Sequence, residues 1–389
     1  MSLETFRAET RAWLEENCPP EMRAPPTDDD PEYVGGRNAT FDSEAQKLWF
    51  ERCRDKGWTV PHWPTEYGGG GLSKEENKIL KEEMVAIGAR RPLTSFGIDM
   101  LGPALLKFGN EAQKKEHLTK ITAGEIRWAQ GYSEPNAGSD LASLMTKCED
   151  KGDHYLINGQ KIWTSYANLA DWIFVLVRTD FEARKHEGIS FVLVDMAQEG
   201  VEARPIKLIS GKSPFCETFF TDARCEKHNL VGEINTGWTI AKYLLTHERT
   251  MIGDLVQAWG ATRPTSEIAA MQLGLDGEGR LAEPMLRRDI VDLEVDALAL
   301  GAYVERLGDM AKSGEGVGAE SSTLKYVGTE YNKRRFETLM DTAGSDGLEW
   351  GAEDDVAANW LRMKGNSIEG GTSEVQLNVI AKRVLGMPG

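Results

Sequence analysis

The chain reads Gly131-Tyr-Ser-Glu-Pro-Asn-Ala-Gly-Ser-Asp140 and, shortly afterwards, Lys161-Ile-Trp-Thr-Ser165, and these two segments decide how it folds. The first offers small residues, hydroxyls and a run of backbone N–H groups, which suit close contact with a polar ring and a pyrophosphate. Alternate residues of a strand share one face, so Trp163 can stack on a ring while Ser165 bonds to its edge. Together the two segments indicate a flavin-binding site.

The region around these segments has the alternating pattern of β-strands. Further strands are predicted at 172–178, 189–195 and 217–221. The Asn158-Gly159 pair predicts a hairpin with a tight primed turn, because these residues accept positive φ angles. We therefore expect a β domain in the middle of the chain.

Helical periodicity precedes and follows this β region. The expected helices are 3–16, 43–56, 74–87 and 111–122 before it, and 238–273, 282–312, 319–343, 353–364 and 373–385 after it. Ser73 and Glu76 form a predicted capping box at the start of the third helix. The chain thus divides into a helical domain at 1–125, a β domain at 126–235 and a helical bundle at 236–389.

Composition limits the partners of the chain. Its 389 residues, 40% of them hydrophobic, fit a folded protein with a substantial core. A formal charge of -17 without a basic block argues against nucleic acid, because phosphate binding needs clustered Lys and Arg. The apolar runs are strand-sized, far below the roughly 20 residues of a membrane-spanning helix. Five cysteines without a CxxC pair, and an N-terminus unlike a signal peptide, predict reduced thiols and a cytoplasmic location.

The motifs resemble those of acyl-CoA dehydrogenases. Besides the two segments above, Glu248-Arg249 and Gly371-Thr-Ser-Glu374 match that family in order and near its spacing, and the resemblance covers the whole chain. It implies an α+β multidomain fold with a helical N-terminal domain, a central β-barrel and a C-terminal four-helix bundle, with FAD held between barrel and bundle. It also implies α,β-dehydrogenation of an acyl-CoA thioester to the trans-2-enoyl-CoA, with the electrons passed to an electron-transfer flavoprotein.

The resemblance implies a cofactor role for nine residues and a metal role for none. It assigns the isoalloxazine edge to Gln130, Tyr132 and Ser133, the approach to the pyrophosphate to Gly138 and Ser139, the hydroxyl near N5 to Ser165, the ring face away from substrate to Trp163, and the ribityl and phosphate region to Thr372 and Glu374.

The reaction needs a carboxylate that removes the α proton, and the sequence offers two. In many family members the base is a Glu directly before Gly-Thr-Ser, but here Gly370 holds that place and Glu369 is displaced by one. A second branch, which includes isovaleryl-CoA and long-chain dehydrogenases, carries its Glu on a bundle helix before an Arg, as Glu248 does here. The residues around Glu248 are largely apolar, which favours a desolvated base over a solvated helical glutamate. We therefore favour Glu248 and keep Glu369 as the alternative.

Two elements that hold the FAD adenosine in most members are altered. The region of the Arg-x-x-Phe-Gly segment, 272–281, contains no phenylalanine, and the Gln-x-x-Gly-Gly-x-Gly element is changed at 341–347. This leaves three arrangements: a homodimer or homotetramer that binds the adenosine differently, a heteromer with a paralogous subunit, or weak FAD retention. Divergent bacterial members that act on bulky acyl-CoAs, including steroid side chains, resemble the chain here.

Two other functions stay open. One is a noncatalytic or half-site subunit of a heteromeric dehydrogenase. The other is a flavin-dependent oxidase or monooxygenase of the same fold.

Overall fold

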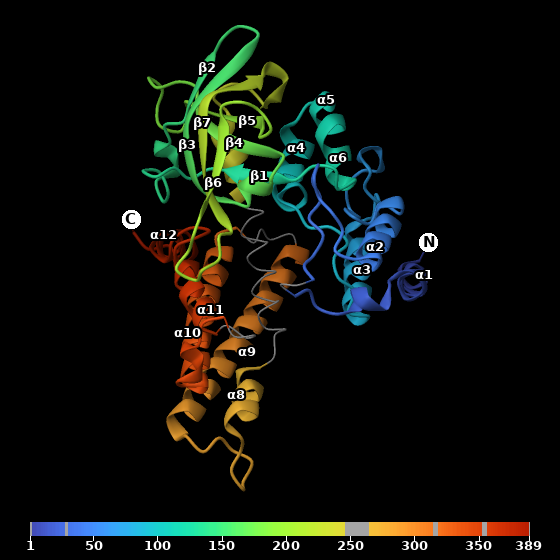
Figure 1. Cartoon of the computed structure of the whole chain (residues 1–389), viewed down its shortest axis with the longest axis vertical. Helices are drawn as coiled ribbons and strands as arrows, with labels where there is room; N and C mark the ends of the chain where they lie inside the picture. The colour runs from blue at the N-terminus through green and yellow to red at the C-terminus, as the bar shows by residue number, and fades with distance from the viewer. Residues whose placement is uncertain (1, 28–29, 246–263, 314–317, 352–355, 389) are drawn as a thin grey trace. The chain divides into compact units, whose positions relative to one another are not determined.

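The computed structural model describes residues 2–27, 30–245, 264–313, 318–351 and 356–388, apart from the side chains of 311 and 312 (Figure 1). Two compact units emerge from the contacts within the chain. The sheet unit comprises Met1–Pro205 and Phe215–Leu244, and the helical unit comprises Ile206–Pro214 and Leu245–Gly389. The short segment 206–214 therefore leaves the sheet unit and belongs to the helical one.

The sheet unit begins with helices. They are α1 (Leu3–Asn17), α2 (Glu44–Asp55), α3 (Lys74–Ala86), α4 (Gly102–Phe108), α5 (Glu111–Gln113) and α6 (Thr119–Thr122), with π-helical turns at Gly97–Leu101 and Lys114–Leu118. The capping box predicted for α3 is confirmed, since the Glu76 amide donates to the Ser73 hydroxyl at 3.2 Å and the Ser73 amide to the Glu76 carboxylate at 2.9 Å. Sequence periodicity missed α4 and the π-helical turn before it.

The strands of the sheet unit form one eight-stranded sheet. They are β1 (Trp128–Gly131), β2 (Lys147–Asp150), β3 (His154–Ser165), β4 (Trp172–Arg178), β5 (Ile189–Asp195), β6 (Val201–Ile206), β7 (Phe215–Glu226) and β8 (Leu230–Val231). Their order is β6-β7-β3-β2-β4-β5-β8, and β1 pairs with β4 in parallel. The end strands β6 and β8 do not pair with each other among the described residues, so the expected closed barrel is not confirmed. The strands predicted at 172–178 and 189–195 are confirmed.

The predicted hairpin at Asn158-Gly159 is wrong, because β3 runs straight through it. Between Ile157 and Gly159 the pairing of β3 with β7 shifts by one residue, and the extra residue lies on β7, where Asp222 has a φ of 52°. The Asn158 side chain accepts from the Asp222 amide and donates to its carboxylate, each at 2.9 Å. A Cβ on Gly159 would lie 2.7 Å from the Cα of Thr146, so glycine serves a close approach of two backbones and not a turn.

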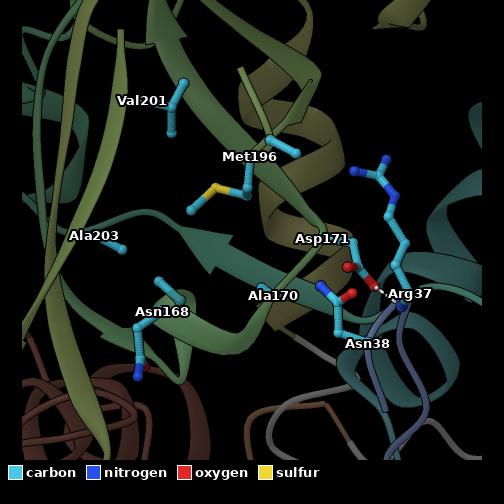
Figure 2. A pocket seen from close by; sticks show the side chains of 10 residues that line it. Arg37, Asn38, Asn168, Ala170, Asp171, Met196, Val201 and Ala203 are labelled. Carbon is cyan, nitrogen blue, oxygen red and sulfur yellow. Dashed lines mark hydrogen bonds between the residues drawn. The ribbon is translucent and has the colours of Figure 1, made fainter. Parts of the chain in front are cut away.

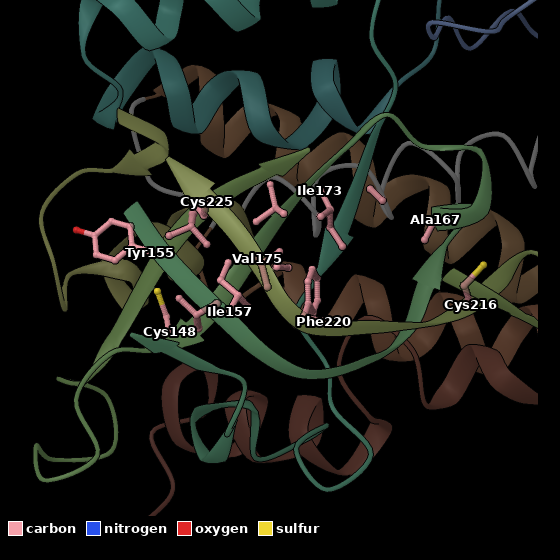
Figure 3. Packing of buried hydrophobic residues seen from close by; sticks show 14 residues of the cluster. Cys148, Tyr155, Ile157, Ala167, Ile173, Val175, Cys216, Phe220 and Cys225 are labelled. Carbon is pink, nitrogen blue, oxygen red and sulfur yellow. The ribbon is translucent and has the colours of Figure 1, made fainter. Parts of the chain in front are cut away.

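The strands of the sheet unit pack around a hydrophobic core of their own (Figure 3). It is an apolar cluster of fourteen buried residues that includes Ile157, Ile173, Val175, Phe220 and Cys225. The near-continuous apolar runs of β4 and β5 supply five of the fourteen, as expected for central strands buried on both faces, and β3 and β7 supply six more.

The helical unit is built around one long helix. Its helices are α8 (Thr265–Leu273), α9 (Pro284–Ser313), α10 (Ser321–Ala343), α11 (Val356–Met363) and α12 (Ser373–Val379), and a π-helical turn, Ile380–Val384, follows α12. Helix α10 contacts α8, α9, α11 and α12, which explains why so many of its residues are buried. The predicted helices at 282–312, 319–343 and 373–385 lie close to α9, α10 and the α12 region.

Candidate functional site

Trp163 lies in a β-bulge of β3. The pairing passes from Lys161 opposite Thr218 to Thr164 opposite Cys216, so β3 contains one residue more than β7 over this interval. Trp163 has a φ of 59°, in the left-handed region that side chains other than glycine rarely adopt. Its side chain is 54% exposed, whereas Thr164 is fully buried. Backbone strain that presents an exposed aromatic ring is typical of a ligand site.

Ser165 follows Trp163 by two residues, at the end of β3. Both flank buried Thr164, and neither of them is buried. The ring of Phe215 meets the indole edge to face, with 6.1 Å between the ring centroids. The exposed indole and the nearby hydroxyl form the arrangement that stacking on a planar ring and bonding to its edge require.

The segment predicted to line the ring edge begins on β1. Gln130 is half-buried and lies opposite Phe174 of β4 in the parallel pairing. Tyr132 is buried and packs edge to face on Phe174, with 6.0 Å between centroids. The Ser133 carbonyl accepts a 2.9 Å bond from the Ile162 amide, one residue before Trp163. The structure therefore brings the two motifs together within the sheet unit.

The rest of the motif is an exposed turn. Glu134 and Ala137 exchange two backbone hydrogen bonds of 3.0 Å, which close the turn. Gly138 and Ser139 follow on the surface, and a Cβ on Gly138 would meet nothing within 4 Å. This open backbone, next to a serine hydroxyl, fits the donor set that an anionic pyrophosphate needs.

A buried ion pair underlies both motifs. Lys161 is fully buried, and its Nζ donates to the Tyr132 carbonyl at 3.1 Å and to Glu134 Oε1 at 2.8 Å. The Glu134 carboxylate also accepts from the amides of Met145, at 2.7 Å, and Thr146, at 2.9 Å. Sequence reasoning missed this pair. The signal was a lysine two residues before Trp163 on a strand whose alternation places it inside.

Burial and pairing shift the pKa of both groups. Burial lowers the pKa of Lys161 to about 8, although the Glu134 carboxylate opposes the shift. Burial alone would raise the pKa of Glu134, but the Lys161 ammonium and the two amide donors hold it below its usual value. Each group thus favours the charged form of the other.

A cavity of about 310 Å³ lies in the sheet unit (Figure 2). Its lining includes Ala167, two residues after Ser165 in the sequence, but none of the predicted cofactor residues. The buried Asp171 carboxylate accepts from the amides of Arg37, at 2.9 Å, and Arg127, at 2.8 Å. These bonds anchor the loop around Arg37 to the sheet unit, and we assign the cavity no ligand.

Three predicted residues lie in the described part of the helical unit. Thr372 is the N-cap of α12 and accepts from the Val375 amide at 3.2 Å, and Glu374 follows in the first turn, where it is exposed. Glu369 accepts bonds of 3.2 and 2.7 Å from Arg362 and one of 2.5 Å from Asn366. Glu248 and its neighbour Arg249 lie outside the described residues.

The setting of Glu369 does not resemble that of a base. Its side chain is 41% exposed and paired with a guanidinium. A base for an α proton gains its strength from desolvation without a counter-ion.

Comparison with known proteins defines the class. Models of the N-terminal, middle and C-terminal domains of acyl-CoA dehydrogenases match residues 2–125, 129–223 and 235–385. The chain belongs to the acyl-CoA dehydrogenase family and is an oxidoreductase that acts on acyl-CoA. Members of this family are flavoproteins, so FAD is the expected cofactor, and the exposed indole and open turn fit it.

Individual relatives support the same class. The chain is 35% identical to the acyl-CoA dehydrogenase IpdE1 of Mycolicibacterium smegmatis, over 100% of its own length and 98% of that protein. It is similar to the steroid ACAD Tcur3481-Tcur3483, with 31% identity, a TM-score of 0.73 and coverage of 99% and 97%. It is also similar to a chain of the ChsE4-ChsE5 complex from Mycobacterium tuberculosis, with 28% identity, a TM-score of 0.72 and coverage of 100% and 98%. In the part of the chain described, no helix is both long and apolar enough to cross a membrane.

Proposed function

We propose that this protein binds FAD and converts an acyl-CoA thioester to its trans-2-enoyl-CoA. The observation that carries the proposal is the exposed Trp163, whose backbone is strained and which lies two residues from Ser165. The preceding residue, Ile162, donates its amide to the Ser133 carbonyl, which joins this strand to the 130–133 segment. When bound, FAD supplies the acceptor for the hydride that leaves the β carbon. The residues of the chain bind and orient the ring.

In this proposal the cofactor contacts follow the chemistry of each residue. Trp163 covers one face of the ring, and Ser165 and the 130–133 segment bond to its edge. Gly138 and Ser139 receive the pyrophosphate, and Thr372 and Glu374 contact the ribityl and phosphate region. We also propose that the domains end at residues 125 and 235 and that the C-terminal domain is a four-helix bundle.

We assign proton abstraction to Glu248. The support is indirect: Glu369 is exposed and held by Arg362 and Asn366, which favours the other carboxylate. Glu248→Gln should abolish flavin bleaching by an acyl-CoA, whereas Glu369→Gln should leave bleaching nearly intact. Normal bleaching by Glu248→Gln would contradict the assignment.

Electrons then pass to an electron-transfer flavoprotein, and the reaction takes place in the cytoplasm. Air reoxidation of the reduced enzyme tests the acceptor, because a dehydrogenase reoxidises slowly without its partner, whereas an oxidase or monooxygenase reoxidises quickly.

The substrate we propose is a bulky acyl-CoA of the steroid side-chain type, and the assembly a dimer or tetramer with a paralogous subunit. The support is the similarity to a steroid ACAD and to a chain of a two-component complex. Full flavin occupancy of the purified single chain would argue against the paralogous subunit.

The decisive experiment is an anaerobic titration with a panel of acyl-CoAs that range from short straight chains to steroid side chains. Loss of the visible flavin band with the bulky members supports the substrate class. Absence of bleaching with every member would reject the dehydrogenase activity and favour the noncatalytic alternative.

A further inference from the structure

Three hydrogen bonds fasten the loop that bears Tyr132 and Ser133 to the strand that bears Trp163. Two come from the Lys161 ammonium, which reaches the Tyr132 carbonyl and the Glu134 carboxylate. The third joins the Ile162 amide to the Ser133 carbonyl at 2.9 Å. Lys161 is thus attached to both cofactor segments, yet its fully buried side chain cannot itself contact a ligand at the surface.

The Glu134 carboxylate extends the attachment to a third segment. One of its oxygens accepts from the Thr146 amide as well as from Lys161, and the other accepts from the Met145 amide. Its own backbone closes the turn with Ala137 that leads to the exposed Gly138. One carboxylate therefore fixes the position of the whole turn.

Stability alone gives little reason for this pair. Replacing a buried ion pair by apolar residues of similar volume is often neutral or stabilising, because desolvation offsets the attraction of the charges. A buried pair does, however, hold its partners at fixed distances and directions. Ligand sites need this, because first-contact residues must be held within about 0.5 Å of the productive geometry.

We infer that Lys161 and Glu134 are positioning residues for the flavin, which set the spacing between the Tyr132–Ser133 segment and the Trp163–Ser165 segment. The inference rests on the proposed function, since it assumes that the two segments hold one flavin. It assigns no contact with the cofactor to either charged group.

The test separates positioning from stability. Flavin is removed from the purified protein and FAD is titrated back, with flavin fluorescence and the visible absorption band as readouts. Lys161→Met should raise the Kd for FAD about 10–100-fold, as the loss of residues that orient metal ligands does for metal affinity. The double variant Lys161→Met/Glu134→Leu should regain only the stability lost to the unpaired charge, and none of the affinity, because the Tyr132 carbonyl still lacks its donor and the Met145 and Thr146 amides lack their acceptor.

Ile157→Ala is the matched control. Ile157 is fully buried on the same inner face of β3, and its truncation costs about 2–5 kcal/mol of stability without touching the loop. Its Kd for FAD should stay within about threefold of the wild type by the same reasoning.

Two results would overturn the inference: a Kd for Lys161→Met equal to that of Ile157→Ala, or recovery of both stability and affinity in the double variant. A wild-type protein that binds no FAD would instead reject the proposed function on which the inference rests.

Discussion

Lys161 in the sheet unit and Lys325 in the helical unit are both buried, but their charges are balanced differently. The Lys161 ammonium lies 2.8 Å from a carboxylate oxygen, whereas the Lys325 ammonium donates to the Asn366 carbonyl at 3.0 Å. The more distant carboxylates of Glu369, Glu330 and Glu374 favour the charged form of Lys325 and so raise its pKa. Burial lowers the pKa of both lysines.

Each lysine nevertheless holds a carbonyl of a segment that leads to predicted cofactor contacts. Lys161 holds Tyr132, and Lys325 holds Asn366, whose side chain reaches Glu369 next to the Gly-Gly-Thr segment. In the sheet unit the lysine that holds the carbonyl is paired with the Glu134 carboxylate. In the helical unit the lysine bonds only to a backbone carbonyl, and the Asn366 side-chain amide makes the link to Glu369. We therefore expect substitutions at the Lys161 site to reduce the free energy of unfolding more than substitutions at the Lys325 site.

The largest effect should follow from Glu134→Leu, which leaves the Lys161 ammonium buried without its partner. An uncompensated buried charge costs about 3–5 kcal/mol. Urea unfolding of the variant should show this loss, and adding Lys161→Met should recover the part due to the unpaired ammonium but not the part due to the Met145 and Thr146 amides, which still lack their acceptor. A loss below about 1 kcal/mol would indicate that the ammonium reaches water, since exposed pairs contribute only that much.

Gly159→Ala should be the next most damaging change. Its Cβ would lie 2.7 Å from the Thr146 backbone, so the strand or its neighbour must shift, at a cost of about 1–3 kcal/mol. Gly365→Ala in the helical unit is the matched control, because its Cβ would meet only the end of one side chain, that of Arg362, at 3.1 Å, and no backbone atom within 4 Å. Equal melting temperatures for the two variants would remove the predicted difference between the units.

Lys325→Met should cost less than Glu134→Leu. It removes one charge-assisted bond and leaves the Asn366 carbonyl without its donor, but strands no charge, so we expect a loss of about 1–3 kcal/mol. Thermal unfolding measures the loss. If it exceeds that of Glu134→Leu, the more distant acids stabilise Lys325 more strongly than the single close carboxylate stabilises Lys161.

Alkaline pH should stabilise the folded protein through Lys161. Its pKa is about 8 in the folded chain, against about 10.4 in an unfolded one, so the unfolded state holds more protons between these values. The free energy of unfolding then rises with pH over this window, by about 2–3 kcal/mol for this group. Lys161→Met should lack that part of the rise in urea titrations at pH 7 to 10, and identical slopes would place the lysine pKa elsewhere.

Trp163→Gly should have the smallest effect on stability, with the opposite sign. Glycine adopts a φ of 59° freely, so the variant should gain up to about 1 kcal/mol while its affinity for FAD falls. Trp163→Phe is the control, since it keeps the strained backbone and an aromatic face. A loss of stability in Trp163→Gly would show that indole packing on Phe215 outweighs the strain.

Residue patterns predicted the elements of this chain better than their connections. The apolar runs of β4 and β5 and the periodicity of α9 and α10 follow from burial of whole faces, which single sequences record well. The Asn158-Gly159 pair misled because a turn and a close approach of backbones both need glycine, and only the neighbour, Thr146, distinguishes them.

The candidate site was predictable to the same extent. Motifs gave the residues that can contact a flavin, because those residue types carry the chemistry. They did not give Lys161 and Glu134, whose roles depend on which segments the fold brings within hydrogen-bond distance. The left-handed backbone of Trp163 also arises from a register shift between β3 and β7, a long-range property that no local pattern records.

Residues 206–214 belong to the helical unit although the residues on either side belong to the sheet unit, and this has a practical consequence for the design of fragments. A fragment that starts at residue 245 would encode the helical unit without this piece, although a Cβ on Gly211 would lie only 3.3 Å from the Trp350 ring. The complementary fragment would carry the piece without the helical unit to which it belongs. The two halves should therefore be expressed together, and single-cut truncations should yield aggregated material.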